Sequence, residues 1–117
     1  MGEEGFRRLV DHFYAGVAAD PVLRPLYPQD LEPSKDHLRL FLIQYWGGPG
    51  TYSEQRGHPR LRMRHLPFAI GRRERDAWFQ HMSNAVRSLE LRPEVAGALL
   101  EYFEEASLGL INRVELS

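Results

Sequence analysis

Five imidazole side chains could bind a metal or move a proton: His12, His37, His58, His65 and His81. No two of them have the spacing of a helical zinc site, and the lack of cysteine excludes thiolate ligands and disulfides. His65 differs because it follows a short stretch of helical character and lies among Leu61, Leu66 and Phe68. One of its ring nitrogens could face an apolar pocket while a backbone carbonyl holds the other. For every histidine the alternative is an ordinary surface or capping role.

Arginine is concentrated in one part of the chain. Residues 56–75 contain seven arginines and a single acidic residue, Glu74. Guanidinium groups suit bidentate contact with carboxylate or phosphate, so the segment could bind a nucleic-acid backbone or the carboxylates of a cofactor. The alternative is a solvated basic surface, which charge alone favours. A net charge of −1 argues against a general nucleic-acid binder.

A third group of residues that could contact a ligand consists of tyrosines and tryptophans: Tyr14, Tyr27, Tyr45, Trp46 and Trp78. Phenol and indole groups need hydrogen-bond partners when buried, so several in one small core predict a polar ligand inside an apolar cavity. Alternatively their polar tips reach the surface, which we favour for Tyr45 and Trp46. No nucleophile elbow, phosphate loop or dinucleotide fingerprint accompanies them.

Helices must position these groups, because apolar residues recur with helical spacing in four segments. The stripes run from Phe6 to Val17, from Leu38 to Tyr45, from Ala77 to Leu89 and, after Pro93, from Val95 to Leu110. Asp20-Pro21 ends the first helix and starts a short one with Pro21 as its first helical residue. Pro33 suits the first turn of the second long helix, and Gly71 precedes the third.

Two loops separate these helices. Residues 27–33 form the first, and residues 47–60 form a longer one that begins in a glycine-rich cluster. One helical turn could follow Thr51, and residues 61–66 could form a brief helix. No alternating run predicts a strand. We therefore expect a single all-α domain over residues 1–117.

Composition limits the class of protein further. With 43% apolar and 26% charged residues, the chain is typical of soluble globular domains. No segment approaches the roughly 20 apolar residues of a membrane span. The acidic N-terminus is unlike a signal or transit peptide, so we expect a cytoplasmic protein.

Several specific motifs cover nearly the whole chain. They are Phe13-Tyr14, Asp20 to Pro28, Leu38-x-x-Phe41-Leu42, Gln44 to Pro49, Thr51 to His65 and Glu74 to Trp78. In these motifs the sequence resembles the truncated haemoglobins, specifically their second group. The resemblance implies a globin-like two-over-two helical sandwich that encloses haem b. The short helix that precedes this region in family members is missing here, which could alter packing or self-association as a homo-oligomer.

The resemblance also assigns roles to residues. It implies that His65 is the proximal iron ligand and that Trp78, Tyr27 and Tyr14 lie on the distal side, where Ser34 falls at a gating position. Arg64, Tyr52 and His37 fall at positions expected to meet the haem propionates. The expected apolar contacts of the haem are Leu38, Phe41, Leu42, Leu61, Phe68 and Met82.

Three functions remain open at this point. The first is reversible binding of dioxygen, and also of carbon monoxide and nitric oxide, at a histidine-ligated ferrous haem with slow release. The second is redox catalysis, as a peroxidase or nitric oxide dioxygenase fed by an external reductase. The third is a non-haem helical module that uses residues 56–75 as a basic docking patch.

Overall fold

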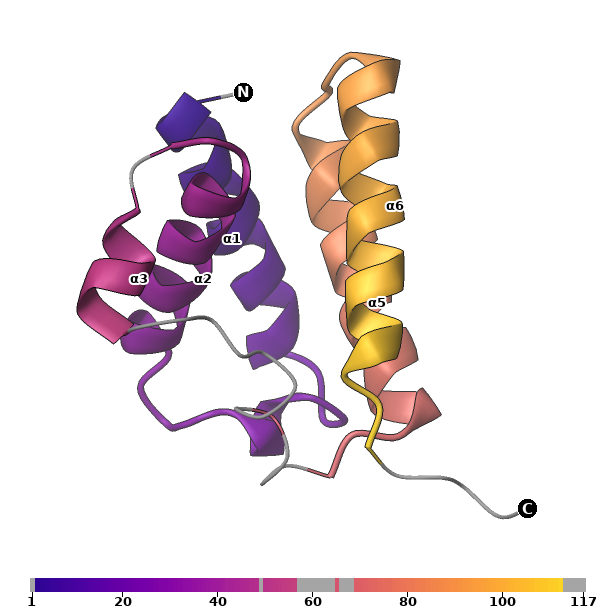
Figure 1. Cartoon of the computed structure of the whole chain (residues 1–117). Coiled ribbons are helices and arrows are strands. Elements are labelled where there is room, and N and C mark those ends of the chain that lie inside the picture. The colour runs from indigo at the N-terminus through magenta and orange to yellow at the C-terminus, as the bar shows by residue number, and fades with distance from the viewer. Residues whose placement is uncertain (1, 49, 57–64, 66–68, 113–117) are drawn as a thin grey trace.

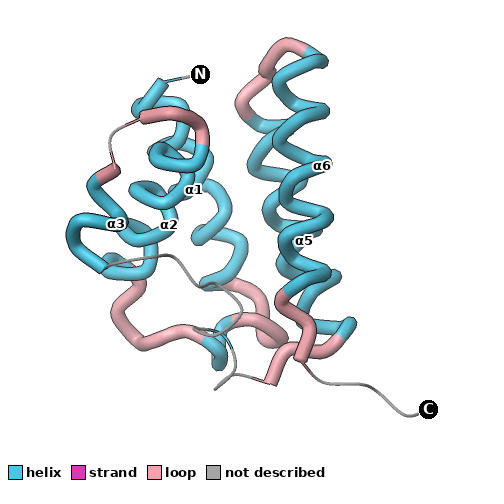
Figure 2. The backbone as a smooth tube through the Cα atoms, viewed as in Figure 1, coloured by secondary structure: helices cyan, strands magenta, loops and turns pink. Residues whose placement is uncertain are grey.

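The structure is a computed structural model that describes residues 2–48, 50–56, 65 and 69–112. The helices are α1 (Gly2–Ala18), the short 3-10 helix η1 (Arg24–Leu26), α2 (Glu32–Tyr45), α3 (Thr51–Arg56), α5 (Arg72–Ser88) and α6 (Pro93–Gly109). These described parts contain helices and loops but no strand (Figure 2). The expected all-α class is therefore confirmed.

The helices form two groups (Figure 1). α2 packs against α1 and α3 on one side of the molecule, and α5 and α6 form an antiparallel hairpin on the other. α1 also packs against α5, so it joins the two groups. The core gathers along this contact and includes Phe13, Val17, Met82, Val86 and Phe103, each at most 2% exposed.

α1 follows the predicted stripe, because its buried residues are Phe6, Leu9, Val10, Phe13, Tyr14 and Val17. The predicted start of the next helix at Pro21 is wrong. Residues 21–23 form turns, and η1 begins only at Arg24. Asp20 organises these turns, since its Oδ1 accepts the Val22 N–H at 2.8 Å and its backbone carbonyl accepts the Arg24 N–H at 2.8 Å.

α2 begins at Glu32, so the loop predicted over residues 27–33 is two residues shorter. Pro33 lies in the first turn as predicted, and the Asp30 side chain accepts the Glu32 N–H at 3.0 Å. The helix ends at Tyr45, and Gly47 follows with a φ of +89°, a conformation that favours glycine.

The helical turn predicted after Thr51 is confirmed, because Thr51–Arg56 forms helix α3. Of the loop predicted over residues 47–60, residues 47, 48 and 50 are not helical, and residues 49 and 57–60 lie outside the described residues. Two hydrogen bonds from α2 hold this short helix. Gln44 Nε2 donates to Ser53 Oγ at 2.8 Å, and Ser53 N–H donates to Gln44 Oε1 at 3.0 Å. Of the brief helix predicted over residues 61–66, only His65 is described.

α5 and α6 begin where the sequence predicts. Glu74 Oε1 accepts the N–H of Gly71 at 2.8 Å, and Pro93 opens α6. His81 on α5 meets the end of α1, because its Nε2 lies 2.6 Å from Asp20 Oδ2. The ring packs so closely on Gly16 that a Cβ at that position would collide with it. None of the described helices is long and apolar enough to cross a membrane.

Candidate ligand pocket between the helix groups

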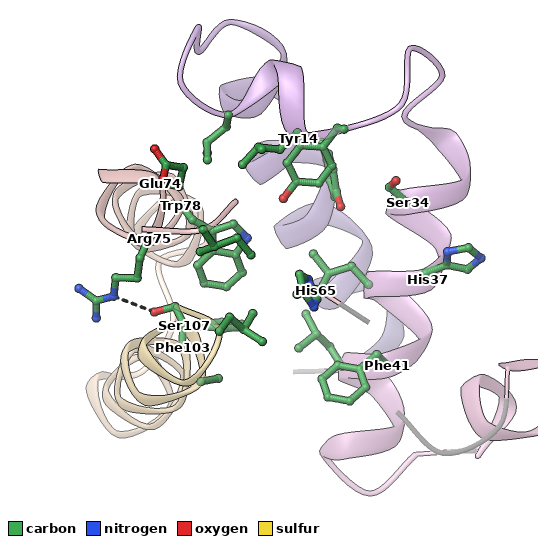
Figure 3. A pocket seen from close by; sticks show the side chains of 18 of the residues that line it. Tyr14, Ser34, His37, Phe41, His65, Glu74, Arg75, Trp78, Phe103 and Ser107 are labelled. Carbon is green, nitrogen blue, oxygen red and sulfur yellow. Dashed lines mark hydrogen bonds between the residues drawn. The ribbon is translucent and has the colours of Figure 1, made fainter. Parts of the chain in front are cut away.

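A cavity of about 360 Å³ lies between the two groups of helices. This volume is in the range of small-molecule sites. Figure 3 shows Trp78 and Phe103 on one side facing His65 and Phe41 on the other, with the Tyr14 hydroxyl directed into the space between them. The apolar part of the wall includes Leu23, Leu26, Pro28, Leu38, Phe41, Leu42, Ile70, Phe103, Ala106 and Leu110.

Two phenols and an indole form a polar cluster at one end of the cavity. The rings of Tyr14 and Tyr27 meet edge to face with centroids 5.6 Å apart. Burial raises the pKa of Tyr14, and it raises the pKa of Tyr27 to about 12 although a hydrogen bond with Trp78 acts in the opposite direction. Both phenols therefore keep their protons at neutral pH and can donate hydrogen bonds to a ligand.

His65 lines the cavity and is half-buried. Its backbone carbonyl accepts a hydrogen bond from Asn112 Nδ2 at 3.0 Å. Among the residues with described positions, no group of three or more histidine, cysteine or acidic side chains could hold a metal. A single imidazole directed into a largely apolar cavity, as His65 is, instead fits an iron whose other ligands come from a macrocycle, so these residues fit haem.

The wall on the α2 side contains the other residues that the sequence singles out. Leu38, Phe41 and Leu42 line the cavity, and so do Ser34 and His37. Tyr52 from α3 also lines it, and its ring meets Phe41 edge-on with centroids 5.5 Å apart.

The structure thus brings most of the predicted site residues together, with two qualifications. Met82 is fully buried in the core and does not line the cavity, so the structure gives its predicted haem contact no support. Leu61, Arg64 and Phe68 lie outside the described residues. The individual roles assigned to the site residues remain predictions.

Arg75 is a residue whose position the sequence analysis misjudged. Arg75 belongs to the segment 56–75 that charge predicts to be a solvated basic surface. In the structure its side chain is only 9% exposed and lines the cavity. Its Nε donates to Ser107 Oγ at 3.0 Å, and its guanidinium lies 4.9 Å from the centre of the Phe79 ring. The missed signal is its spacing, because residue 75 precedes Trp78 and Phe79 by three and four positions on the inward face of α5.

The cavity also includes α6 residues that sequence reasoning missed. Tyr102, Phe103, Ala106 and Ser107 complete the wall on that side, together with Leu110 just after the helix. Tyr102 links the cavity to the surface, because its ring centroid lies 4.3 Å from that of Tyr45 and 5.0 Å from that of Trp46, and both of these rings are exposed. Helical spacing identifies these positions as buried but cannot separate a cavity wall from solid core.

Comparison with known proteins places this arrangement in context. The model of a family described as bacterial-like globin matches residues 1–110. The chain is 41% identical to group 2 truncated hemoglobin YjbI of Bacillus subtilis over 115 residues, which cover 98% of this chain and 87% of that protein.

Solved structures agree with the sequence comparison. A hemoglobin from the thermophilic phototrophic bacterium Chloroflexus aurantiacus superposes with a TM-score of 0.94 at 58% identity, over 96% of this chain and 93% of that one. A truncated oxygen-avid haemoglobin from Bacillus subtilis superposes with a TM-score of 0.91 at 41% identity, over 95% and 94% of the two chains. The similarity thus extends over all the helices that form the cavity.

Proposed function

The chain belongs to the bacterial-like globin family, among the group II truncated haemoglobins, and from this membership we propose that it binds dioxygen reversibly at a haem iron held by His65. The observation that carries the proposal is the cavity itself. It has an imidazole on one side, phenol and indole donors on another, and apolar walls between them. The oxygen-avid relative from Bacillus subtilis has the same fold, which supports dioxygen as the ligand.

Bound haem b supplies an iron position that is open to dioxygen, carbon monoxide or nitric oxide. The chain's own residues explain how such a ligand is retained. Tyr27 and Trp78 both line the cavity and offer an O–H and an N–H donor. Because bound dioxygen carries partial negative charge, donors held in place before the ligand arrives stabilise it and slow its release.

The remaining side chains have supporting roles in this proposal. Leu38, Phe41 and Leu42 line the cavity and would keep water away from a bound haem. Tyr52, His37 and Arg64 are proposed to meet the propionates at its edge. Ser34, which is half-buried in the α2 wall, is proposed to border the path of the entering gas.

The test is the absorption spectrum of the purified chain after addition of haem, in the oxidised, reduced and carbon monoxide forms. We expect an intense Soret band that shifts on reduction and again with carbon monoxide. His65→Ala should abolish stable haem binding, whereas His12→Ala, an exposed position on α1, should not. A chain that takes up no stoichiometric haem would disprove the proposal.

Redox catalysis is the second candidate, as a peroxidase or nitric oxide dioxygenase that receives electrons from an external reductase. One observation favours it. Tyr102 borders the cavity, and its ring contacts the exposed rings of Tyr45 and Trp46, so a row of oxidisable side chains reaches the surface. Turnover of peroxide or nitric oxide well above that of free haem would support this candidate. Turnover equal to that of free haem would rule out this candidate and leave reversible binding as the remaining function.

A further inference from the structure

Asn112 joins the end of α6 to the segment that contains His65. Its Nδ2 donates to the backbone carbonyl of His65 at 3.0 Å, and its Oδ1 accepts the N–H of Ile70 at 2.9 Å. Its own backbone N–H donates to the Ile70 carbonyl at 2.8 Å. One residue therefore makes three hydrogen bonds across 42 and 47 positions of sequence.

These bonds lie beside the cavity. His65 and Ile70 both line it, and so does Leu110, two residues before Asn112. The contacts made by Asn112 are partly shielded from water, which makes each hydrogen bond more costly to lose than one at an exposed site. A hydrogen bond to the main chain of residue 65 restrains its Cα and therefore the origin of its imidazole.

We propose that Asn112 is a positioning residue for His65, because it ties the main chain of His65 to the end of α6 and so fixes where the imidazole enters the cavity. The proposal rests on the proposed function, in which His65 binds the haem iron. In metal sites, loss of a partner that fixes the orientation of a ligand typically lowers metal affinity or activity by about 10- to 100-fold.

Two variants separate the roles of the two amide atoms of Asn112, Nδ2 and Oδ1. Asn112→Asp keeps an oxygen that can accept the Ile70 N–H but places a second acceptor opposite the His65 carbonyl. Asn112→Ala removes both atoms. The matched control is Asn84→Asp, the same change on the exposed face of α5, where Asn84 Oδ1 accepts a hydrogen bond from Gln80 at 3.2 Å.

The measurements are haem transfer to an excess of a haem-scavenging apoprotein and the iron–histidine stretching band of the ferrous chain. We expect Asn112→Asp to release haem roughly three to ten times faster than the unmodified chain and to shift or broaden that band. Asn84→Asp should behave as the unmodified chain in both. Amide exchange at Ile70 should accelerate in Asn112→Ala and remain slow in Asn112→Asp.

The results separate this inference from the proposed function. If the unmodified chain binds no haem, the proposed function fails. If it binds haem but Asn112→Asp releases haem at the original rate with an unchanged iron–histidine band, the positioning role is overturned. Faster release without a band change, in step with a lower melting temperature of the haem-free chain, would also overturn it, because Asn112 would then act only on general stability.

Discussion

Trp78 and Tyr27 show how single residues in this cavity depend on each other. The Trp78 indole lies close enough to the Tyr27 phenol to oppose part of the rise that burial causes in its pKa, and both side chains border the space where a gas ligand would bind. Trp78 is held in place by edge contacts with Phe13 and Phe103, whose ring centroids lie 5.3 and 5.8 Å from its own. A rigid indole of this kind loses little freedom when it donates to a ligand.

Replacing Trp78 with Phe should therefore speed dioxygen dissociation. A lost hydrogen bond to a partly charged acceptor corresponds to about 1–2 kcal/mol, or a roughly five- to thirtyfold faster rate. Stopped-flow displacement of dioxygen by carbon monoxide measures this rate. Trp46→Phe, at a position 38% exposed, is the control and should leave it unchanged. An unaltered rate in Trp78→Phe would remove the indole from this role.

The raised pKa of Tyr27 predicts a loss of stability in alkali. Burial lifts it from 10 to about 12, so the unfolded chain releases this proton at lower pH than the folded chain does. The contribution of the protonated Tyr27 to the free energy of unfolding is thus complete below pH 10 and is lost as the pH rises towards 12. Urea unfolding of the haem-free chain between pH 8 and 12 measures this. Tyr27→Phe should show a smaller decline, and an equal decline in both chains would refute the assignment.

At the scale of elements, the bounds of the helices with long apolar stripes are predictable, whereas those of the short helices are predicted only in part. α1 and α6 follow directly from periodicity and from Pro93. The local pattern predicts a helical turn after Thr51, but it does not report the side chain of Gln44, which reaches Ser53 nine residues away and holds α3 against α2. The site shows the same division. The resemblance identifies His65 and Trp78, whereas Arg75 and the α6 wall become apparent only when α5 and α6 are packed together.

The contact between α1 and α5 allows a sharp test. Gly16→Ala places a Cβ against the His81 ring and should disturb the 2.6 Å contact of that ring with Asp20. We expect a loss of about 1–3 kcal/mol in the free energy of unfolding, as is usual for overpacking. Thermal or urea unfolding provides the measurement.

Gly97→Ala on α6 is the matched control for this change. A Cβ at Gly97 meets nothing within 4 Å, and alanine favours helix more than glycine does. This variant should gain about 0.5–1 kcal/mol. If both substitutions changed stability in the same direction, the close packing of α5 on α1 would not be the reason.

For the molecule as a whole, the cavity is a gap in the contact between the two groups of helices. Its walls come from α1, α2, α3, α5 and α6 together with η1, so a ligand inside it touches almost every element. A group that binds only the folded chain stabilises the whole fold in proportion to its occupancy. Ligand binding and overall stability should therefore be coupled.

Addition of stoichiometric haem should raise the melting temperature of the chain, and the rise should grow with the excess of haem. At a free concentration one hundred times the dissociation constant, the expected gain is about 2.7 kcal/mol. Calorimetry or circular dichroism measures the shift. His65→Ala should show a much smaller rise, and an equal rise in that variant would point to non-specific haem adsorption.

The two tryptophans of the chain occupy very different surroundings, with Trp78 in the cavity wall and Trp46 at the surface. Excited indoles pass their energy to a nearby pigment, whereas a dissolved quencher such as iodide reaches only exposed rings. The fluorescence of the protein therefore has one component that reports on the cavity and one that reports on the solvent. With Trp46→Phe the tryptophan fluorescence of the chain would come from Trp78 alone, and its intensity would report directly on the filling of the cavity.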